Sequence, residues 1–378
     1  MRRETIRLAT RGSALAVSQA TVVKSALEER RHDVELVEIE TTGDRVRDEL
    51  IHRLGTTGAF VRSLDEQVLD GTVDAAVHSL KDVPTEQPDD LIFAAVPERA
   101  AAGDVLVTPD GRSLDELSEG AVVGTSSLRR RAQLLAARPD ITVVPLRGNV
   151  DTRVEKLLAP SLQRERDRRR AAQGNEDEAD GTDTDEADGT DAEDAFERSV
   201  AEWLDERSTL ERRALERPVD EEFDAIVLAA AGLERSGLLR QLQTYPLPLD
   251  GFVPAPGQGA ITVTMLDTEL AQLLHRILDN PRTRVEVTVE RTILSHLGGG
   301  CIAPLGVNAI VQGEFVRTRV QVLSQDGTEV IDATRDLPIQ RYTTAARSLA
   351  DDLARRGARD LVEAAKKEPA TEPSREEE

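Results

Sequence analysis

Sulfur and aromatic side chains are scarce in this 378-residue chain. It contains one cysteine, Cys301, and two methionines, and Phe, Trp and Tyr together make up 2% of the residues. A single cysteine cannot form an internal disulfide, and the five histidines are scattered without the Cys/His spacing of a zinc site. The sequence therefore supports neither a disulfide framework nor a metal site.

Long apolar runs and a secretory leader are also lacking. No segment approaches the length of a transmembrane helix, and MRRETIRLAT leads straight into an alternating, strand-like segment. We therefore expect a cytoplasmic protein without a membrane partner.

Positive charge is in deficit, and lysine supplies little of it. The formal net charge is −23, and only five of the 48 basic residues are lysines, which leaves 43 arginines. An acidic chain is a poor nucleic-acid binder, because neutralising phosphates requires a basic face. Since salt screens long-range repulsion, an acidic and lysine-poor surface suits a salt-rich cytoplasm, and we expect a halophilic source.

Strand-like and helix-like segments alternate over the first two thirds of the chain. The first set has strands at 6–10, 34–40 and 73–79 and helices at 14–30 and 60–69. The second set has strands at 104–108, 121–127, 141–148 and 223–233 and helices at 128–137 and 151–158. Strands separated by helices predict parallel sheets, so we expect two α/β domains of similar design.

Residues 160–220 interrupt the second set. A basic run, QRERDRRR (163–170), precedes NEDEADGTDTDEADGTDAED (175–194), in which DEADGTD occurs twice. Such polar, low-complexity sequence buries too little apolar area to offset its ordering entropy. We expect 171–194 to be disordered and the whole segment to be an insertion in the second α/β domain, with Trp203 and Leu210 in a short amphipathic helix.

The carboxyl-terminal part has a different pattern. Alternation favours a strand at the start of 283–297, whereas i, i+4 spacing of apolar residues favours a helix, and both readings stay open. Segments near 305–311, 315–323 and 328–335 predict an antiparallel sheet, and 343–365 predicts a closing amphipathic helix. A third, small α+β domain is expected.

Six arginines fall where strands give way to helices. They are Arg11, Arg129, Arg130, Arg147, Arg153 and Arg235. Arg129 and Arg130 follow the turn Gly124-Thr125-Ser126-Ser127, whose backbone N–H groups and helix dipole suit an anion. Any single arginine could be a solvated surface cation, but six at the ligand end of α/β sheets predict a ligand with several carboxylates. Phosphate is disfavoured because no P-loop is present.

The heptapeptide HSLKDVP (78–84) leaves the strand 73–79 at the same end. It places Ser79, Lys81 and Asp82 beside the expected ligand. A carboxylate there can stabilise a developing cation or transfer a proton, although Asp82 could equally cap a turn. We expect His78 to be a core residue.

Cys301 follows three glycines in SHLGGGCIAPLG. A buried thiol usually acts as a small hydrophobe, but glycine-rich backbone also lets a thiol approach a ligand closely. No Cys-His-Asn arrangement is evident, so a thiol-dependent acyl transferase is a weak hypothesis. An anchoring thiol is a better one.

Taken together, these pieces resemble the porphobilinogen deaminase (hydroxymethylbilane synthase) family over nearly the whole chain outside the insertion. The matching stretches are IRLATRGSALAVSQA, TTGDR, DAAVHSLKDVP, VGTSSLRRRAQL, LRGNVDTR, LAAAGLERSG, PAPGQGA and GGGCIAPLG.

The resemblance implies an α/β fold of three domains, two of them like the lobes of periplasmic binding proteins. We accordingly assign residues 1–98 and 258–279 to the first lobe, 99–257 to the second, 280–366 to an α+β domain carrying Cys301, and 367–378 to a disordered tail. It also implies a monomer that joins four porphobilinogen molecules head to tail into hydroxymethylbilane, with loss of ammonia. A two-lobed carboxylate-binding protein without catalysis is the alternative.

The resemblance also assigns residues to roles. A dipyrromethane cofactor would be held by a thioether to Cys301, and Asp82 would stabilise the pyrrole nitrogens and the azafulvene cation. The cofactor would further be held by Lys81, Ser79, Thr125, Ser127, Arg129 and Arg130. The substrate and the growing chain would be held by Arg11, Ser13, Arg147, Arg153, Arg235 and Phe60.

Overall fold

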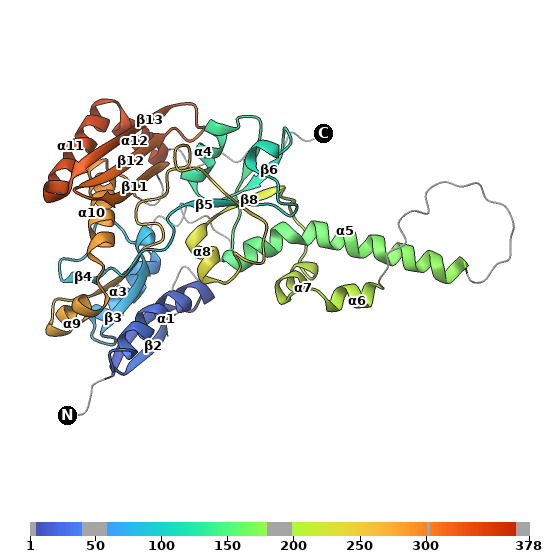
Figure 1. Ribbon diagram of the computed structural model, residues 1–378, viewed down its shortest axis with the longest axis horizontal. Coiled ribbons are helices and arrows are strands. Elements are labelled where there is room, and N and C mark those ends of the chain that lie inside the picture. Colours follow the sequence, from blue (N-terminus) through green and yellow to red (C-terminus); the bar gives the residue numbers. More distant parts are fainter. Residues whose placement is uncertain (1–4, 40–58, 180–198, 301–302, 368–378) are drawn as a thin grey trace.

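The computed structural model describes residues 5–39, 59–179, 199–300 and 303–367. Figure 1 shows three groups of elements: a first lobe mostly in blue, with residues 261–278 in orange, a second lobe in green and yellow, and a carboxyl-terminal domain in orange and red. The two lobes are each built around a five-stranded sheet, and the third domain around a three-stranded one.

The first lobe has the strand order β2-β1-β3-β10-β4. Its strands are β1 (Ile6–Arg11), β2 (Val34–Ile39), β3 (Ala75–Ser79), β4 (Leu91–Ala95) and β10 (Ile261–Leu266). β1 is parallel to β2 and β3, whereas β10 is antiparallel to β3 and β4. The covering helices are α1 (Ala14–Glu28), α3 (Ala59–Leu69) and α9 (Glu269–Leu278). Helices against the sheet explain why β3 and β10 are buried along almost their whole length.

The second lobe repeats this topology with the order β7-β6-β8-β5-β9. Its strands are β5 (Asp104–Val107), β6 (Val122–Gly124), β7 (Thr142–Val144), β8 (Ala225–Ala229) and β9 (Thr244–Pro246), and its helices are α4 (Leu128–Ala137), α5 (Val150–Ala179) and α8 (Ala230–Arg235). In both sheets, three parallel strands are followed by an antiparallel strand that enters from the other lobe. The chain therefore crosses between the lobes twice, through 96–103 and 247–260, which we call the first and second crossing segments.

The carboxyl-terminal domain packs helices on an antiparallel sheet. Its elements are α10 (Pro281–His296), β11 (Leu305–Gln312), β12 (Phe315–Leu323), β13 (Val330–Pro338), α11 (Tyr342–Arg355) and α12 (Ala358–Lys367). Segment 283–297 is thus helical: Asn280 caps α10, Pro281 occupies its first turn, and Val289 and Ile293 are fully buried. The single closing helix expected at 343–365 is two helices, because Gly357 adopts φ +97° between them.

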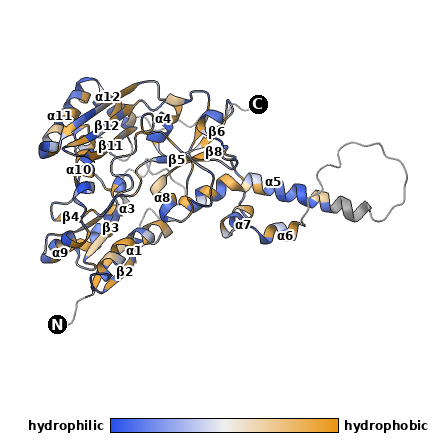
Figure 2. Cartoon of the chain, viewed as in Figure 1, coloured by the Kyte–Doolittle hydropathy of each residue, from blue (hydrophilic) through white to orange (hydrophobic). Residues whose placement is uncertain are grey.

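Helix α5 is much longer than the predicted 151–158. It extends away from the lobes to Ala179, with α6 (Val200–Asp205) and α7 (Thr209–Leu215) beside it (Figure 1). Disorder beginning at 171 is therefore wrong for 171–179, and 180–194 lies outside the described residues. Glu165 pairs with Arg168 and Arg169 within the helix, and Arg169 also stacks over Trp203 at 5.5 Å. These contacts support a helix whose outer half is strongly hydrophilic (Figure 2).

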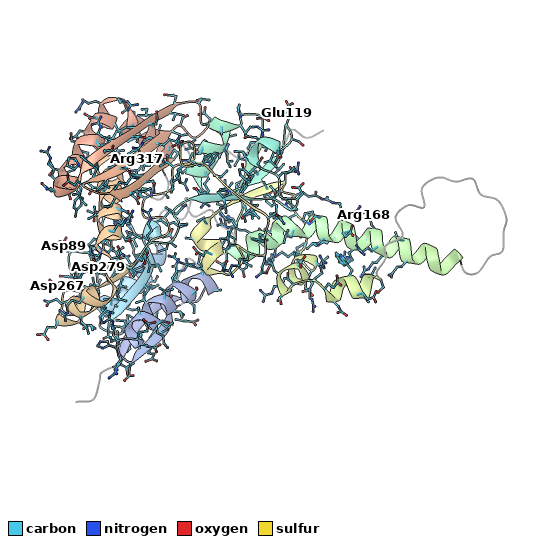
Figure 3. All side chains as sticks on the ribbon, viewed as in Figure 1. Asp89, Glu119, Arg168, Asp267, Asp279 and Arg317 are labelled. Carbon is cyan, nitrogen blue, oxygen red and sulfur yellow. The ribbon has the colours of Figure 1, made fainter. Side chains whose placement is uncertain are left out.

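The fold class predicted from the sequence is confirmed: two α/β lobes and a small α+β domain. Three short 3₁₀ helices complete the secondary structure of the described ranges, η1 (Leu80–Asp82), η2 (Leu114–Glu116) and η3 (Ile339–Arg341). Among these residues, no helix is both long and apolar enough to cross a membrane. Figure 3 labels charged side chains on all three domains, among them Asp267 in the first lobe, Glu119 in the second and Arg317 in the third.

Candidate functional site

Strand β3 ends at Ser79 and turns directly into η1, which carries Lys81 and Asp82. Leu80 is buried and anchors this turn, while Asp82 is exposed. Gly257, in the second crossing segment, lies against the turn: a Cβ there would be 3.0 Å from Leu80 Cγ and 3.2 Å from the Lys81 nitrogen. With φ at +74° as well, this position requires glycine. The crossing segment therefore fixes where Lys81 and Asp82 emerge.

The corresponding turn of the second lobe connects β6 to α4. Ser127 Oγ caps α4 by accepting a hydrogen bond from the backbone nitrogen of Arg130 at 3.4 Å, and Thr125 Oγ1 accepts one from the backbone nitrogen of Ser127 at 3.2 Å. Both hydroxyls, predicted to hold the cofactor, thus shape the amino-terminal end of α4. A hydroxyl that accepts in this way can still donate to an anion.

Arg129 and Arg130 both bind one buried carboxylate, Asp104, at the start of β5. Arg129 Nη2 donates to Asp104 Oδ2 at 2.8 Å, and Arg130 Nη2 donates to Oδ1 at 2.7 Å. Burial by itself would raise the pKa of Asp104, but the two guanidinium groups hold that pKa well below its usual range. Asp104 was not singled out from the sequence; its only signal is an acidic residue opening the apolar strand DVLV.

The second crossing segment contributes to the same cluster. Gln258 Nε2 donates to Asp104 Oδ1 at 2.8 Å, and the Val253 carbonyl accepts from Arg129 Nη1 at 2.9 Å. Arg129 Nε is buried and has no hydrogen-bond partner among the described residues. This cluster ties helix α4 to the connection between the lobes.

Positive charges from the two lobes meet next to Asp82. Burial lowers the pKa of Lys81, Asp82 opposes that shift, and the charges of Arg130 and Arg153 lower the pKa further. Burial, followed by the charge of Arg130, lowers the pKa of Arg153 to about 10. Lys81 and Asp82 belong to the first lobe and the two arginines to the second, so the structure brings both sets together. Four cations, counting Arg129, face two carboxylates, Asp82 and Asp104, and this excess of positive charge fits an acidic ligand.

The other predicted arginines have contacts of their own. Arg235 Nη2 donates to the Gly259 carbonyl in the second crossing segment at 2.7 Å, and burial lowers the pKa of Arg235. Arg153 Nε donates to the Gly148 carbonyl at 2.8 Å. Arg11 is the last residue of β1 and Arg147 lies three residues beyond the end of β7, and both are half-buried. Ser13 Oγ caps α1 by accepting from the backbone nitrogen of Ala16.

Two predicted residues cannot be placed. Cys301 lies outside the described residues, and so does the side chain of Phe60. His78 is buried as expected, with Nε2 at 2.9 Å from Asp65 Oδ1 and 3.0 Å from Thr264 Oγ1.

Glu290 on α10 is a further residue that the sequence did not single out. Its fully buried carboxylate binds both Nη atoms of Arg99, at 2.8 and 3.1 Å, and accepts from the Gly257 nitrogen at 2.7 Å and the Ala309 nitrogen at 2.8 Å. Burial raises the pKa of Glu290 even though Arg99 opposes the shift. This carboxylate joins the third domain to both crossing segments.

The fold and the site together define a two-lobed α/β protein with a third domain, whose lobes meet at a cationic cluster suited to a ligand with several carboxylates. Comparisons with known proteins identify its relatives. The description "Porphobilinogen deaminase, dipyromethane cofactor binding domain" matches residues 6–164 and 198–272, and "Porphobilinogen deaminase, C-terminal domain" matches 284–355. The chain belongs to the porphobilinogen deaminase family.

Curated relatives agree over almost the full length. A probable porphobilinogen deaminase of Halobacterium salinarum is 53% identical, covering 97% of this chain and 100% of the relative, and one of Methanococcoides burtonii is 36% identical, covering 95% and 96%. The predicted family, its deaminase function and the dipyrromethane cofactor are thereby confirmed, and the first relative fits a halophilic source.

Solved structures with a similar chain trace are binding proteins. A periplasmic substrate-binding protein from Coxiella burnetii has a TM-score of 0.35 at 11% identity, covering 74% of this chain and 94% of that one. The methionine-binding protein MetQ has a TM-score of 0.34 at 13% identity, covering 74% and 92%. At these values the likeness carries no argument about function.

Proposed function

We propose that this chain joins four porphobilinogen molecules head to tail into hydroxymethylbilane, releasing one ammonia for each, and that the cationic cluster between its lobes is the active site. The observation that carries this proposal is the electrostatic coupling of Lys81 with Arg130 and Arg153, next to Asp82. Every pyrrole of the substrate and product carries two carboxylates. A partly buried excess of positive charge is what such a chain of acids requires.

The dipyrromethane cofactor supplies the primer for this assembly when it is bound. The residues proposed to hold it are Cys301 through a thioether, Lys81, Ser79, Thr125, Ser127, Arg129 and Arg130. Arg129 and Arg130 are rigidly placed, since each binds Asp104. The unpartnered Arg129 Nε and the hydroxyls at the start of α4 add donors suited to carboxylates.

Asp82 is proposed as the catalytic residue. It is exposed on η1, on a turn fixed by Leu80 and Gly257, and it lies beside Lys81. As ammonia leaves the aminomethyl group, positive charge spreads over the substrate's pyrrole ring, and a nearby carboxylate stabilises that charge. The same carboxylate can accept the proton lost from a ring carbon when the new bond forms.

The other predicted residues are proposed to hold the substrate and the growing chain. They are Arg11, Ser13, Arg147, Arg153, Arg235 and Phe60. We also propose a cytoplasmic monomer, divided into domains at the boundaries predicted from the sequence. The sheet memberships of β5 and β10 support a first lobe that includes a segment after the second crossing.

Replacing Asp82 by Asn tests this proposal. The assay follows hydroxymethylbilane formation from porphobilinogen by the purified holoenzyme in high KCl. We expect kcat to fall at least 100-fold, the usual worth of a positioned acid or base, with an unchanged circular dichroism spectrum. Asp89→Asn is the control, because Asp89 is an exposed aspartate after the same turn (Figure 3). Full turnover by Asp82→Asn would refute the assigned role.

A further inference from the structure

A cavity lies between the first lobe and the third domain, apart from the cationic cluster. Its volume is about 600 Å³, within the range of small-molecule sites. One side is formed by residues of the first lobe between η1 and the end of β4, and the other by α10 and α11. None of the residues assigned to the active site lines it.

The charge of this cavity is opposite to that of the chain. Its lining includes three arginines and one histidine, Arg284, Arg291, Arg347 and His296, but no aspartate or glutamate. The whole chain carries 71 acidic residues and a net charge of −23. A cavity that excludes carboxylates in such a chain favours anionic ligands.

One wall of the cavity combines an arginine with an aromatic ring. The Arg291 guanidinium lies 5.1 Å from the centre of the Phe93 ring, and it donates to the Val83 carbonyl at 2.8 Å and to the Pro84 carbonyl at 2.7 Å. These contacts hold the guanidinium and the ring in fixed positions. Leu80, Val96 and Val287 add apolar surface. An apolar ring can therefore stack here next to a cation.

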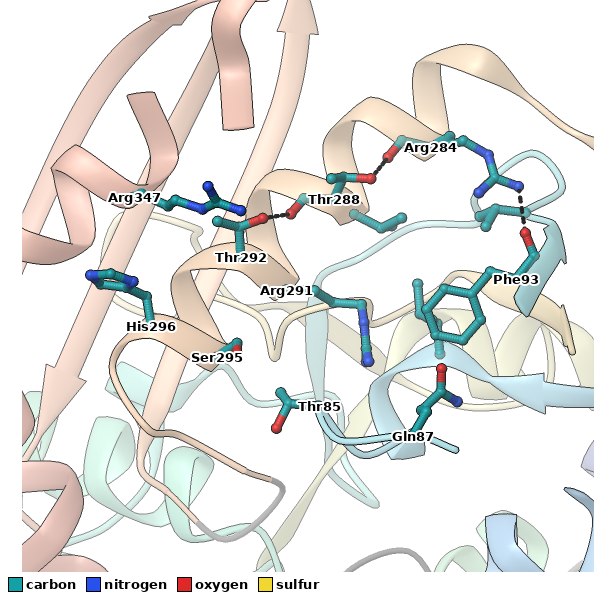
Figure 4. A pocket seen from close by; sticks show the side chains of 13 residues that line it. Thr85, Gln87, Phe93, Arg284, Thr288, Arg291, Thr292, Ser295, His296 and Arg347 are labelled. Carbon is teal, nitrogen blue, oxygen red and sulfur yellow. Dashed lines mark hydrogen bonds between the residues drawn. The ribbon is translucent and has the colours of Figure 1, made fainter. Parts of the chain in front are cut away.

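Polar groups line both sides of the cavity. Figure 4 shows Arg347 and His296 on the side of the third domain, with Thr85, Gln87 and Phe93 across from them. Arg347 is exposed and has no carboxylate within ion-pair distance among the described residues, and Gln87 Nε2 is buried without a hydrogen-bond partner among them. By contrast, His296 Nε2 is 2.6 Å from Asp351 Oδ1, and Arg284 binds Asp279, so these two are already paired.

We propose that this cavity is a second ligand site, which binds a small organic anion with an apolar ring bearing one or two carboxylates. The ring would lie against Phe93 and the apolar floor. The carboxylates would accept hydrogen bonds from Arg347 and Gln87. This site stands independently of the activity proposed for the cationic cluster, since the two share no residue.

Isothermal titration calorimetry of the holoenzyme with phthalate, at fixed high KCl, tests the proposal. We expect saturable binding to one site that persists when porphobilinogen is present. Arg347→Gln should weaken phthalate at least fivefold, because it removes a charge-assisted hydrogen bond. Arg317→Gln is the matched control, an exposed arginine on β12 outside the cavity, and should leave the affinity unchanged.

A second variant and two further probes separate the contributions. Ser295→Phe places a ring at the exposed rim of the cavity and should abolish binding. Inorganic phosphate, which lacks a ring, and benzyl alcohol, which lacks a charge, should both bind at least tenfold more weakly than phthalate. The proposal is overturned if phthalate does not saturate, if Arg347→Gln and Ser295→Phe bind it like the unchanged protein, or if porphobilinogen displaces it.

Discussion

Asp104 offers the sharpest quantitative prediction. Its side chain is fully buried and accepts from Arg129, Arg130 and Gln258 through four hydrogen bonds. Asp104→Asn keeps the size of the side chain but removes its charge, so that two buried guanidinium groups lose their shared counterion. Removing one partner of a buried ion pair typically costs about 3–5 kcal/mol in the free energy of unfolding. We expect a loss in that range.

The assay is urea unfolding followed by circular dichroism, at a single high KCl concentration. Asp140→Asn is the control, because Asp140 forms an equally short two-point pair with Arg138, at 2.5 and 2.7 Å, on the surface. A surface pair contributes much less, so the control should barely move the midpoint. If both variants lose the same small amount of unfolding free energy, Asp104 is not the buried counterion of the two arginines.

The pH dependence of this effect follows from its sign. The pKa of Asp104 in the folded protein lies below its unfolded value of about 3.9, so its stabilisation is complete above that value and is lost as the pH falls below it. The difference in unfolding free energy between the unchanged protein and Asp104→Asn should therefore be constant from pH 8 to pH 5. A difference that shrinks steadily across this window would contradict the assigned shift.

Three further predictions concern other parts of the molecule. Gly257→Ala should lower both the stability, measured by urea unfolding, and kcat, measured by product formation, because the added Cβ would crowd the turn that carries Asp82. Unchanged values of both would mean that the second crossing segment does not fix this turn. Arg153→Gln should raise the KM for porphobilinogen about tenfold with little loss of stability, since its charge is disfavoured by burial and by Arg130, and an unchanged KM would place it outside the substrate site. Trp203→Ala should increase hydrogen exchange in α5 and α7, because the Trp203 ring is buried beside Arg169 and Arg207, while kcat stays the same. A matching fall in kcat would show that the extension formed by α5, α6 and α7 serves the active site.

The placement of Lys81, Asp82, Arg129 and Arg130 where strands give way to helical turns was predictable from the sequence, because it follows local patterns. Parallel strands separated by helices place their carboxyl ends at one edge of each sheet, so Lys81 follows β3 at that edge in the first lobe and Arg130 follows β6 in the second. That the two edges bring Lys81 near Arg130 and Arg153 is a finding of the structure, because these residues belong to different sheets. Ser79–Asp82 leaves β3 as a short 3₁₀ helix that ends before Pro84, and Thr125–Ser127 connects Gly124 to the capped start of α4. The proline, glycine and hydroxyl residues of these segments indicate such turns.

The sequence could not show side-chain contacts that depend on strands and helices far apart along the chain. Asp104 reaches Arg129 and Arg130 because β5 enters the sheet from the first crossing segment and pairs antiparallel with β8 and β9, and no local pattern reveals that crossing. Glu290 likewise meets Gly257 through the packing of α10 on the second crossing segment. The length of α5 was missed for a different reason: its basic run lacks apolar periodicity, and its support comes from Glu165 and from Trp203, which lies 34 residues beyond Arg169.

The intact mass of the purified protein is the decisive measurement for the proposed bond between Cys301 and the cofactor. We predict a mass that exceeds that of the sequence by one dipyrromethane, and peptide mapping should place this adduct on Cys301. Cys301→Ala should lack both the adduct and the activity. A fully active protein whose mass equals that of the bare sequence would rule out this bond.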